Sequence, residues 1–265
     1  MIYSKRKNFG VLCRVVLSVL IFAGCVSAPV ERDDAREVTE EEKAFLSRYL
    51  ETLTVKVSFR EDSAEDSLYR EAVTGFARKI LAREGFLAED GGDAEAAIEI
   101  DAVSEGESRR ENHYGTAFVR CCLVEPFTGA RRELPGITAP RTFSKASPFD
   151  AAVNATEAAL VRMLPEAVAE TRAFLVELYG KGIVYGLVAR NMGSGAAGFR
   201  KAFAGKVRGL TIEEETPERT RYGFAFFGTP EDAEAAAKDA AAEAGITGFA
   251  IQERKGKLLN CNGGN

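Results

Sequence analysis

Cys25 is the residue whose surroundings most clearly indicate chemistry. The apolar run VVLSVLIFA at 15–23 comes shortly before it, and Gly24 separates the run from the cysteine. Four basic residues precede the run: Lys5, Arg6, Lys7 and Arg14. A basic segment, a short apolar core and small residues before a cleavage point are typical of an export signal. The pattern predicts that residues 1–24 are a signal peptide and that the mature chain begins at Cys25.

The tetrapeptide Phe22-Ala23-Gly24-Cys25 resembles the lipobox of bacterial lipoproteins, with Phe22 where Leu is commonest. The resemblance implies that lipid such as palmitate is attached to the Cys25 sulfur and to its new amino group. Several acyl chains hold a protein stably on a bilayer, since each buried methylene contributes about 0.8 kcal/mol. Val26 rather than Asp follows the cysteine, and by the same analogy this favours the outer membrane, with the protein facing the periplasm.

Two other interpretations of this segment stay open. A membrane-spanning helix needs about 20 apolar residues, and the run at 15–23 is shorter than that. In an ordinary secretory signal, Cys25 would be incidental. Cleavage in either kind of export signal places the mature chain outside the cytoplasm.

Gly193, Gly195 and Gly198 form the string G-x-G-x-x-G, which brings a pyrophosphate to the start of a helix in dinucleotide-binding folds. Glu213 lies at the spacing of the ribose-binding acid. However, three residues separate the expected strand from Gly193, and the chain that remains is too short for a two-halved nucleotide fold. We therefore expect an ordinary loop and no cofactor, with these three glycines as the candidates if a nucleotide does bind.

The thiols and the histidine do not form a catalytic or metal-binding set. Cys121 and Cys122 are adjacent on an expected strand, so they point to opposite faces and are expected to be buried thiols. A disulfide from one of them to Cys261 is the alternative. His113 is the single histidine, and no C-x-x-C or H-x-x-x-H pair is present. We assign no catalytic and no metal-ligating residue.

The charge of the chain is acidic, with 35 basic and 40 acidic residues and a formal net charge of -5. Removing residues 1–24, which hold four basic and no acidic residues, makes the charge of the mature chain -9. The basic residues are scattered rather than clustered. A nucleic-acid partner is therefore not expected.

The first domain is expected at 39–180, after a tether at 25–38 that contains few apolar residues. Thr39 and Glu42 form a capping box that begins a helix. The apolar periodicity then predicts strands at 53–59, 96–103 and 114–124, a helix at 67–85, a weak hairpin at 131–143, and a long helix at 147–179 that Pro165 kinks or restarts.

The second domain is expected at 181–262. Its pattern predicts strands at 183–188, 210–214, 222–227 and 248–252, the last continued at 257–259, and helices at 196–207 and 230–244. This order is βαββαβ, the ferredoxin-like split unit. The predicted fold class is α+β with two small domains, an α/β sandwich with a mixed sheet followed by the ferredoxin-like unit.

Four segments of the first domain follow one another as strand, helix end, strand, and strand with turn: VKVSF at 55–59, LAREGF at 81–86, AIEI at 97–100 and LVEPFTG at 123–129. In this order, residues 53–176 resemble one domain of certain bacterial envelope lipoproteins. These are the penicillin-binding-protein activator of the outer membrane, the curli-secretion lipoprotein and the Tol-system periplasmic protein, in its amino-terminal domain. The resemblance implies an envelope α/β domain and supplies no binding residue.

We therefore expect a lipid-anchored protein of the bacterial cell envelope that is not an enzyme. It would act as an interaction or assembly module with a protein partner in the envelope. One alternative is a subunit of an oligomeric secretion apparatus. Another is an enzyme, either nucleotide-dependent through residues 193–198 or a hydrolase that uses paired carboxylates.

Overall fold

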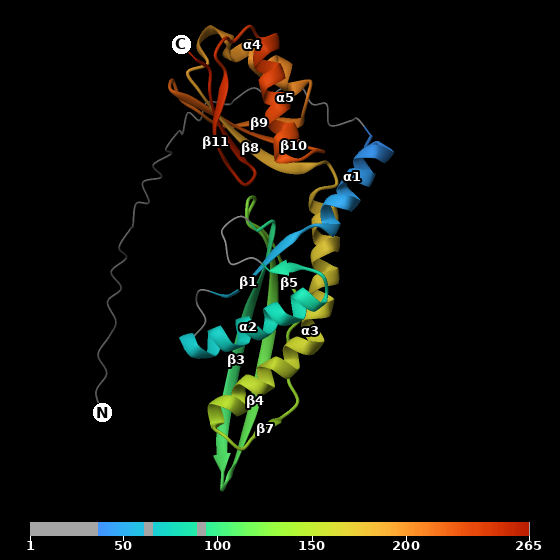
Figure 1. Ribbon diagram of the computed structural model, residues 1–265, viewed down its shortest axis with the longest axis vertical. Coiled ribbons are helices and arrows are strands. Elements are labelled where there is room, and N and C mark those ends of the chain that lie inside the picture. Colours follow the sequence, from blue (N-terminus) through green and yellow to red (C-terminus); the bar gives the residue numbers. More distant parts are fainter. Residues whose placement is uncertain (1–36, 61–65, 89–93, 265) are drawn as a thin grey trace, which may run out of the picture.

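Two sheets, each with helices packed against it, make up the computed structural model, which describes residues 37–60, 66–88 and 94–264 (Figure 1). This arrangement confirms the expected α+β class with two small α/β units. The expected limit between them, at 180–181, lies in the turn after the long helix. The predicted signal peptide, Cys25 and all but the last two residues of the tether lie outside the described residues.

The first sheet is mixed, in the order β2-β1-β3-β4-β5, with β6 and β7 also paired to β4. Its strands are β1 (Thr54–Phe59), β2 (Leu87–Ala88), β3 (Ala96–Arg109), β4 (Asn112–Glu125), β5 (Ala130–Glu133), β6 (Ile137–Thr138) and β7 (Thr142–Ser144). β1 runs parallel to β2 and β3, and the remaining pairs are antiparallel. The hairpin expected at 131–143 is instead three short strands that all pair with β4.

β3 and β4 are longer than the expected strands and form one continuous hairpin. Their register runs from Ala97 opposite Val124 to Arg109 opposite Asn112, and Arg110 adopts a positive φ of 59° at the turn. The distal half of β3 is mostly polar and exposed, so it has no apolar alternation from which a strand could be predicted.

Among the described residues, three helices belong to the first unit: α1 (Glu40–Glu51), α2 (Ser67–Arg83) and α3 (Pro148–Leu178). The capping box expected at Thr39 is present, with the Thr39 hydroxyl accepting from the Glu42 N–H and the Glu42 carboxylate accepting from the Thr39 N–H. In Figure 1, α3 runs along the first sheet and ends next to the second unit. None of the described helices combines the length and apolar composition that crossing a bilayer requires.

α3 does not restart at Pro165, contrary to one of the two outcomes expected there. Pro165 has no backbone N–H to donate, which weakens a helix at that point. Leu164 and Ala167 on either side are fully buried, so the packed face of α3 continues across the proline. Tertiary packing of that face keeps the two halves in one helix.

Gly106 and Gly115 form a cross-strand pair where α3 begins against the hairpin. A Cβ atom at Gly106 would lie 2.1 Å from the Pro148 carbonyl oxygen, and one at Gly115 would lie 1.8 Å from the Ala151 carbonyl oxygen. No side chain fits at those distances. The two glycines therefore let the helix backbone rest directly on the strand backbones.

The second sheet has the order β11-β12-β8-β10-β9. Its strands are β8 (Ile183–Arg190), β9 (Arg208–Glu215), β10 (Arg219–Phe226), β11 (Ala250–Lys255) and β12 (Leu258–Asn262), and its helices are α4 (Ala196–Ala204) and α5 (Pro230–Glu243). β10 lies between β8 and β9, which is the split βαβ arrangement expected for a ferredoxin-like unit.

The end of this sheet differs from the prediction. Residues 257–259 do not continue the strand at 248–252, because Gly256, at a φ of 56°, reverses the chain. β12 then lies between β11 and β8 and runs parallel to β8. Leu259 and Cys261 of β12 are fully buried whereas β11 is largely exposed, so the apolar strand takes the interior position.

Replacing Gly115 with Ala is expected to destabilise the protein by about 1–3 kcal/mol, because the added methyl overlaps the Ala151 carbonyl. Gly75→Ala is the matched control: Gly75 lies within α2 with no atom within 4 Å of an added Cβ, so the change should stabilise by up to about 1 kcal/mol. Urea unfolding of the two variants measures both changes. Equal stability of the two would contradict the close approach described above.

Candidate functional site

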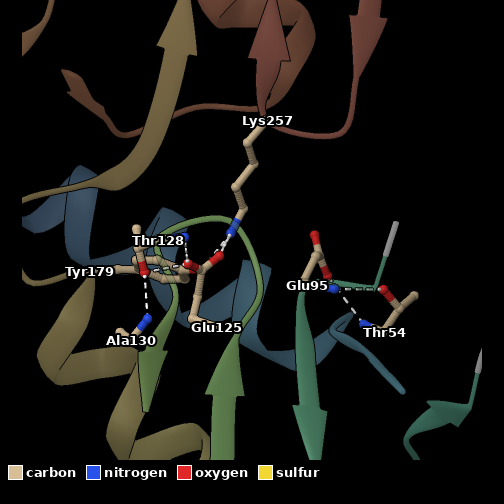
Figure 2. A network of polar contacts seen from close by, with 7 residues as sticks. All are labelled: Thr54, Glu95, Glu125, Thr128, Ala130, Tyr179 and Lys257. Atoms are coloured by element: carbon tan, nitrogen blue, oxygen red, sulfur yellow. Dashed lines mark hydrogen bonds and ion pairs between the residues drawn. The ribbon is translucent and has the colours of Figure 1, made fainter. Parts of the chain in front are cut away.

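Glu125 is a buried carboxylate at the end of β4, where the first unit meets the second (Figure 2). Its Oε2 accepts hydrogen bonds from both the backbone N–H and the hydroxyl of Thr128, each at 2.6 Å. Its Oε1 accepts from Lys257 Nζ at 2.7 Å and from the Tyr179 hydroxyl at 3.2 Å. A carboxylate has about four acceptor positions, so the protein itself fills all of them.

Lys257 reaches this carboxylate from the other unit, out of the turn between β11 and β12. Its ammonium also donates to the Tyr179 hydroxyl and lies 4.7 Å from the centre of that ring. Its backbone is held in place, because the Gly186 N–H of β8 donates to the Lys257 carbonyl at 3.0 Å. The ion pair therefore joins residues 132 positions apart in the chain.

Phe127 makes an apolar contact between the same two units. It lies in the turn after β4, and a Cβ atom at Gly186 would be 3.1 Å from its ring. The absence of a side chain at Gly186 thus leaves room for the Phe127 ring against β8. Both units contribute residues to one continuous cluster of buried side chains, including Leu175, Tyr179 and Tyr185.

Glu95 provides a second, half-buried carboxylate at the same end of the hairpin, one residue before β3 (Figure 2). It accepts from the Thr54 N–H at 3.1 Å, and its own N–H lies 3.4 Å from the Thr54 hydroxyl. Burial and then the charge of the Glu95 carboxylate raise the pKa of Tyr49 on α1. Glu95 is held by β1 of its own unit through Thr54.

The pKa values of Glu125 and of the nearby tyrosines lie further from neutral pH than their ordinary values. Burial alone would raise the pKa of Glu125, but Lys257 and Thr128 outweigh burial and the net pKa is lowered. Burial, with Glu95 or Glu125 nearby, raises the pKa values of Tyr49, Tyr179 and Tyr185. At pH 7 Glu125 is thus ionised and the tyrosines are protonated. None of these four groups is poised to exchange a proton near neutrality.

A cavity of about 620 Å³ lies between the two units beside this network. Its walls come from α1, the open end of the β3–β4 pair, the turn after β4, β8, the start of α5 and the β11–β12 turn. The residues that line it are Tyr49, Ala94, Glu95, Glu125, Pro126, Phe127, Tyr185, Pro230, Arg254, Lys255, Gly256, Lys257 and Leu258. Ligand cavities occur preferentially at such domain interfaces, and this volume lies within their usual range.

A second ion pair joins the units at the amino end of α1. Arg208 of β9 contacts both Glu42 carboxylate oxygens, at 2.9 and 2.8 Å. Burial would raise the pKa of Glu42, but its hydrogen bonds with Thr39 and the Arg208 charge lower it overall. Glu42 thus caps its own helix and holds the second unit at the same time.

Two of the three candidate glycines of the nucleotide string, Gly195 and Gly198, lie against the turn after α5, and Gly193 is exposed. A Cβ atom at Gly195 would lie 2.6 Å from Ile246 Cγ1, and one at Gly198 would lie 3.4 Å from Ala244 Cβ. Gly193 adopts a positive φ of 53° in a short 3₁₀ turn that leads into α4. The side of Gly195 and Gly198 on which a Cβ atom would stand thus faces the turn after α5. Glu213 pairs with Arg221 on the neighbouring strand.

The described thiols are free and buried. Cys121 belongs to the main core, and Cys122 belongs to a separate small cluster with Ala97 and Val124, so the two do point to opposite faces. Burial raises the pKa of Cys121 and of Cys261 to about 12. No group of three His, Cys, Asp or Glu that could hold a metal occurs in the described part of the chain.

The comparisons with known proteins add distant likenesses. Neither the family models nor the curated proteins give a match. Solved structures similar to about half of the chain include bacterial lipoproteins. The minor lipoprotein from Acinetobacter baumannii is 7% identical, with 47% of this chain and 95% of that chain covered and a TM-score of 0.30. Lipoprotein GNA1162 from Neisseria meningitidis is 15% identical, with 46% and 99% covered and a TM-score of 0.28.

A third example is the rare lipoprotein B from Shewanella oneidensis, 12% identical, with 47% and 95% covered and a TM-score of 0.22. TM-scores this low establish neither a common fold nor a common role. The resemblance to the activator, curli-secretion and Tol proteins stays a prediction.

Glu125 and Lys257 were not among the residues selected from the sequence. Two patterns in the sequence could have indicated them. Glu125 ends the apolar run CCLVE at 121–125, and Lys257 comes directly before the apolar pair Leu258-Leu259. Charged residues are rarely buried without a partner. That rule indicates that a partner exists and does not identify it.

Glu125→Gln is expected to destabilise the protein by about 3–5 kcal/mol at pH 7, because it leaves Lys257 charged and unpaired in a buried site. Glu133→Gln is the control: Glu133 is an exposed partner of Arg60, and its removal should cost at most about 1 kcal/mol. Urea unfolding of Glu125→Gln, Lys257→Met and the Glu125→Gln/Lys257→Met double variant measures the coupling, and the double variant should lose less than the sum of the two single variants.

The pH dependence of the unfolding free energy is a second test of the ion pair between Glu125 and Lys257. Because the folded state lowers the pKa of Glu125, its contribution is complete above the ordinary value of 4.5 and is lost as the pH falls below that value. Glu125→Gln should therefore reduce the loss of stability below pH 4.5. Two results together would contradict the coupling. One is that Glu125→Gln leaves the pH dependence of the unfolding free energy below pH 4.5 unchanged, and the other is that the destabilisations of the single variants add up in the double variant.

Proposed function

We propose that this protein is a lipid-anchored component of the bacterial cell envelope that works as a non-catalytic interaction or assembly module. The observation that carries the proposal is the order of residues before Cys25: basic head, short apolar core, Ala-Gly, then cysteine. Lipid on Cys25 would hold the two α/β units at a bilayer, on the periplasmic side of the outer membrane.

A non-catalytic role is supported by the polar network between the units. Its most buried carboxylate, Glu125, has every acceptor position filled by protein donors, and its pKa is lowered. The three nearby tyrosines have raised pKa values. A general acid or base needs a pKa near the working pH and an open position toward a substrate. These groups are instead suited to holding the two units together.

The outer face of the β3–β4 pair is our candidate for the surface that meets the protein partner. Val103 and Phe118 are directly opposite each other and are 62% and 42% exposed. Phe143 of β7, opposite Tyr114 on the same face, is 46% exposed. The alternate residues of these strands face the helices. Exposed apolar side chains grouped on one face are typical of protein-binding surfaces.

Lipid attachment is tested by metabolic labelling with an alkyne analogue of palmitate in a bacterial host. The wild-type chain should be labelled and should sediment with membranes, whereas Cys25→Ser should lose both properties. Cys13→Ser is the matched control, since Cys13 would be removed with residues 1–24 and its loss should leave labelling unchanged. Equal labelling of the Cys25→Ser chain would overturn the anchor.

The interaction surface is tested by placing a photo-crosslinking amino acid at Phe118 in the anchored protein. Irradiated cells should give one dominant crosslinked protein, identified by mass spectrometry. The same amino acid at Arg162, exposed on α3, should give much less of that product. If both positions give the same products, or none, the outer face of β3 and β4 is not where a partner binds.

A further inference from the structure

We infer that the cavity between the two units binds an organic anion that carries an apolar body, such as a carboxylate or a phosphate ester on an aliphatic or aromatic group. This inference goes beyond the proposed function and does not depend on lipid attachment. It rests on which hydrogen-bonding groups of the cavity wall are already occupied and which are still available.

The most buried acceptor of the wall, the Glu125 carboxylate, is occupied. Glu125 receives four donors, from Lys257, Tyr179 and the two groups of Thr128. Glu95, which is half-buried, accepts the Thr54 N–H on Oε2. A cationic ligand, or a metal ion, would have to displace protein donors to reach Glu125. The buried carboxylate therefore offers no open position to a positive charge.

The donors of the wall are in excess. The turn segment Arg254-Lys255-Gly256-Lys257 brings three basic side chains to the cavity. Arg254 is paired with Glu231, and Lys257 uses two of its three N–H groups on Glu125 and Tyr179. Lys255 is exposed and makes no ion pair with any residue in the described ranges. The charged groups that this turn makes available are thus cationic donors, which suit a carboxylate or phosphate.

Apolar surface makes up much of the remaining wall. The half-buried rings of Tyr49 and Phe127 come from the first unit, and Leu258 and Pro230 come from the second. A cavity of about 620 Å³ is large enough for a small organic molecule rather than for a bare ion. Charge at the β11–β12 turn and apolar contact elsewhere together define the class of ligand.

Isothermal titration of the full chain in dodecyl maltoside tests this inference. The probes are hexyl phosphate and hexanoate, with hexyltrimethylammonium and hexanol as the cationic and neutral amphiphiles of equal chain length. Saturable binding is expected for the anions and not for the other two. A stronger response to hexyl phosphate would indicate a phosphate ester, and a stronger response to hexanoate a carboxylate.

Lys255→Gln should weaken binding of the better anion about three- to tenfold, because it removes an exposed charge that has no ion-pair partner in the described part of the chain. Lys201→Gln, the same substitution at an exposed position on α4 outside the cavity, should bind like wild type. The preferred anion should also raise the melting temperature of wild type more than that of Lys255→Gln. Absence of saturable anion binding, equal binding of the cationic amphiphile, or equal affinities of both variants would each overturn the inference.

Discussion

The buried ion pair between Glu125 and Lys257 is the interaction on which the relation of the two units depends. Removing a charge from water costs several kcal/mol, and the cost is recovered only where geometry is good and the remaining hydrogen-bonding positions are filled. Here the conditions are met by three different elements: the turn after β4 supplies Thr128, the end of α3 supplies Tyr179, and the β11–β12 turn supplies Lys257. The carboxylate is satisfied only when all three are in place, so the pair selects one arrangement of the units.

The position of β12 makes this pair possible. In the expected ferredoxin-like order, the strand directly after α5 pairs with β8. That strand would be the last one of the sheet. Instead the chain passes along the exposed edge as β11, reverses at Gly256 and returns as β12 beside β8. The reversal lies next to the first unit, as shown by the Lys257 contacts and by Leu258, which lies against Gly186 together with Phe127. One change in strand order thus provides both the ion pair and a wall of the cavity.

Local sequence patterns were sufficient to predict most elements and insufficient to predict how they meet. The capping box at Thr39, the strands of alternating apolar residues and the ends of α5 depend on neighbours a few residues away, so short-range rules apply to them. The helix through Pro165 and the place of β12 depend on burial against distant elements, which overrides local preference. Glu125 and Lys257 are 132 residues apart, and nothing in the local sequence of either one indicates the other.

α1, the first described helix, also takes part in the contacts between the two units. At its first turn, Glu42 pairs with Arg208 of the second unit, and near its end Tyr49 packs edge-on against Tyr179. A single short helix therefore contacts the second unit at one end and the carboxylate network at the other. Because Tyr49 also lines the cavity, the first described helix is one of the walls that a bound molecule would touch. Within the described chain, α1 thus connects the second unit, the carboxylate network and the cavity.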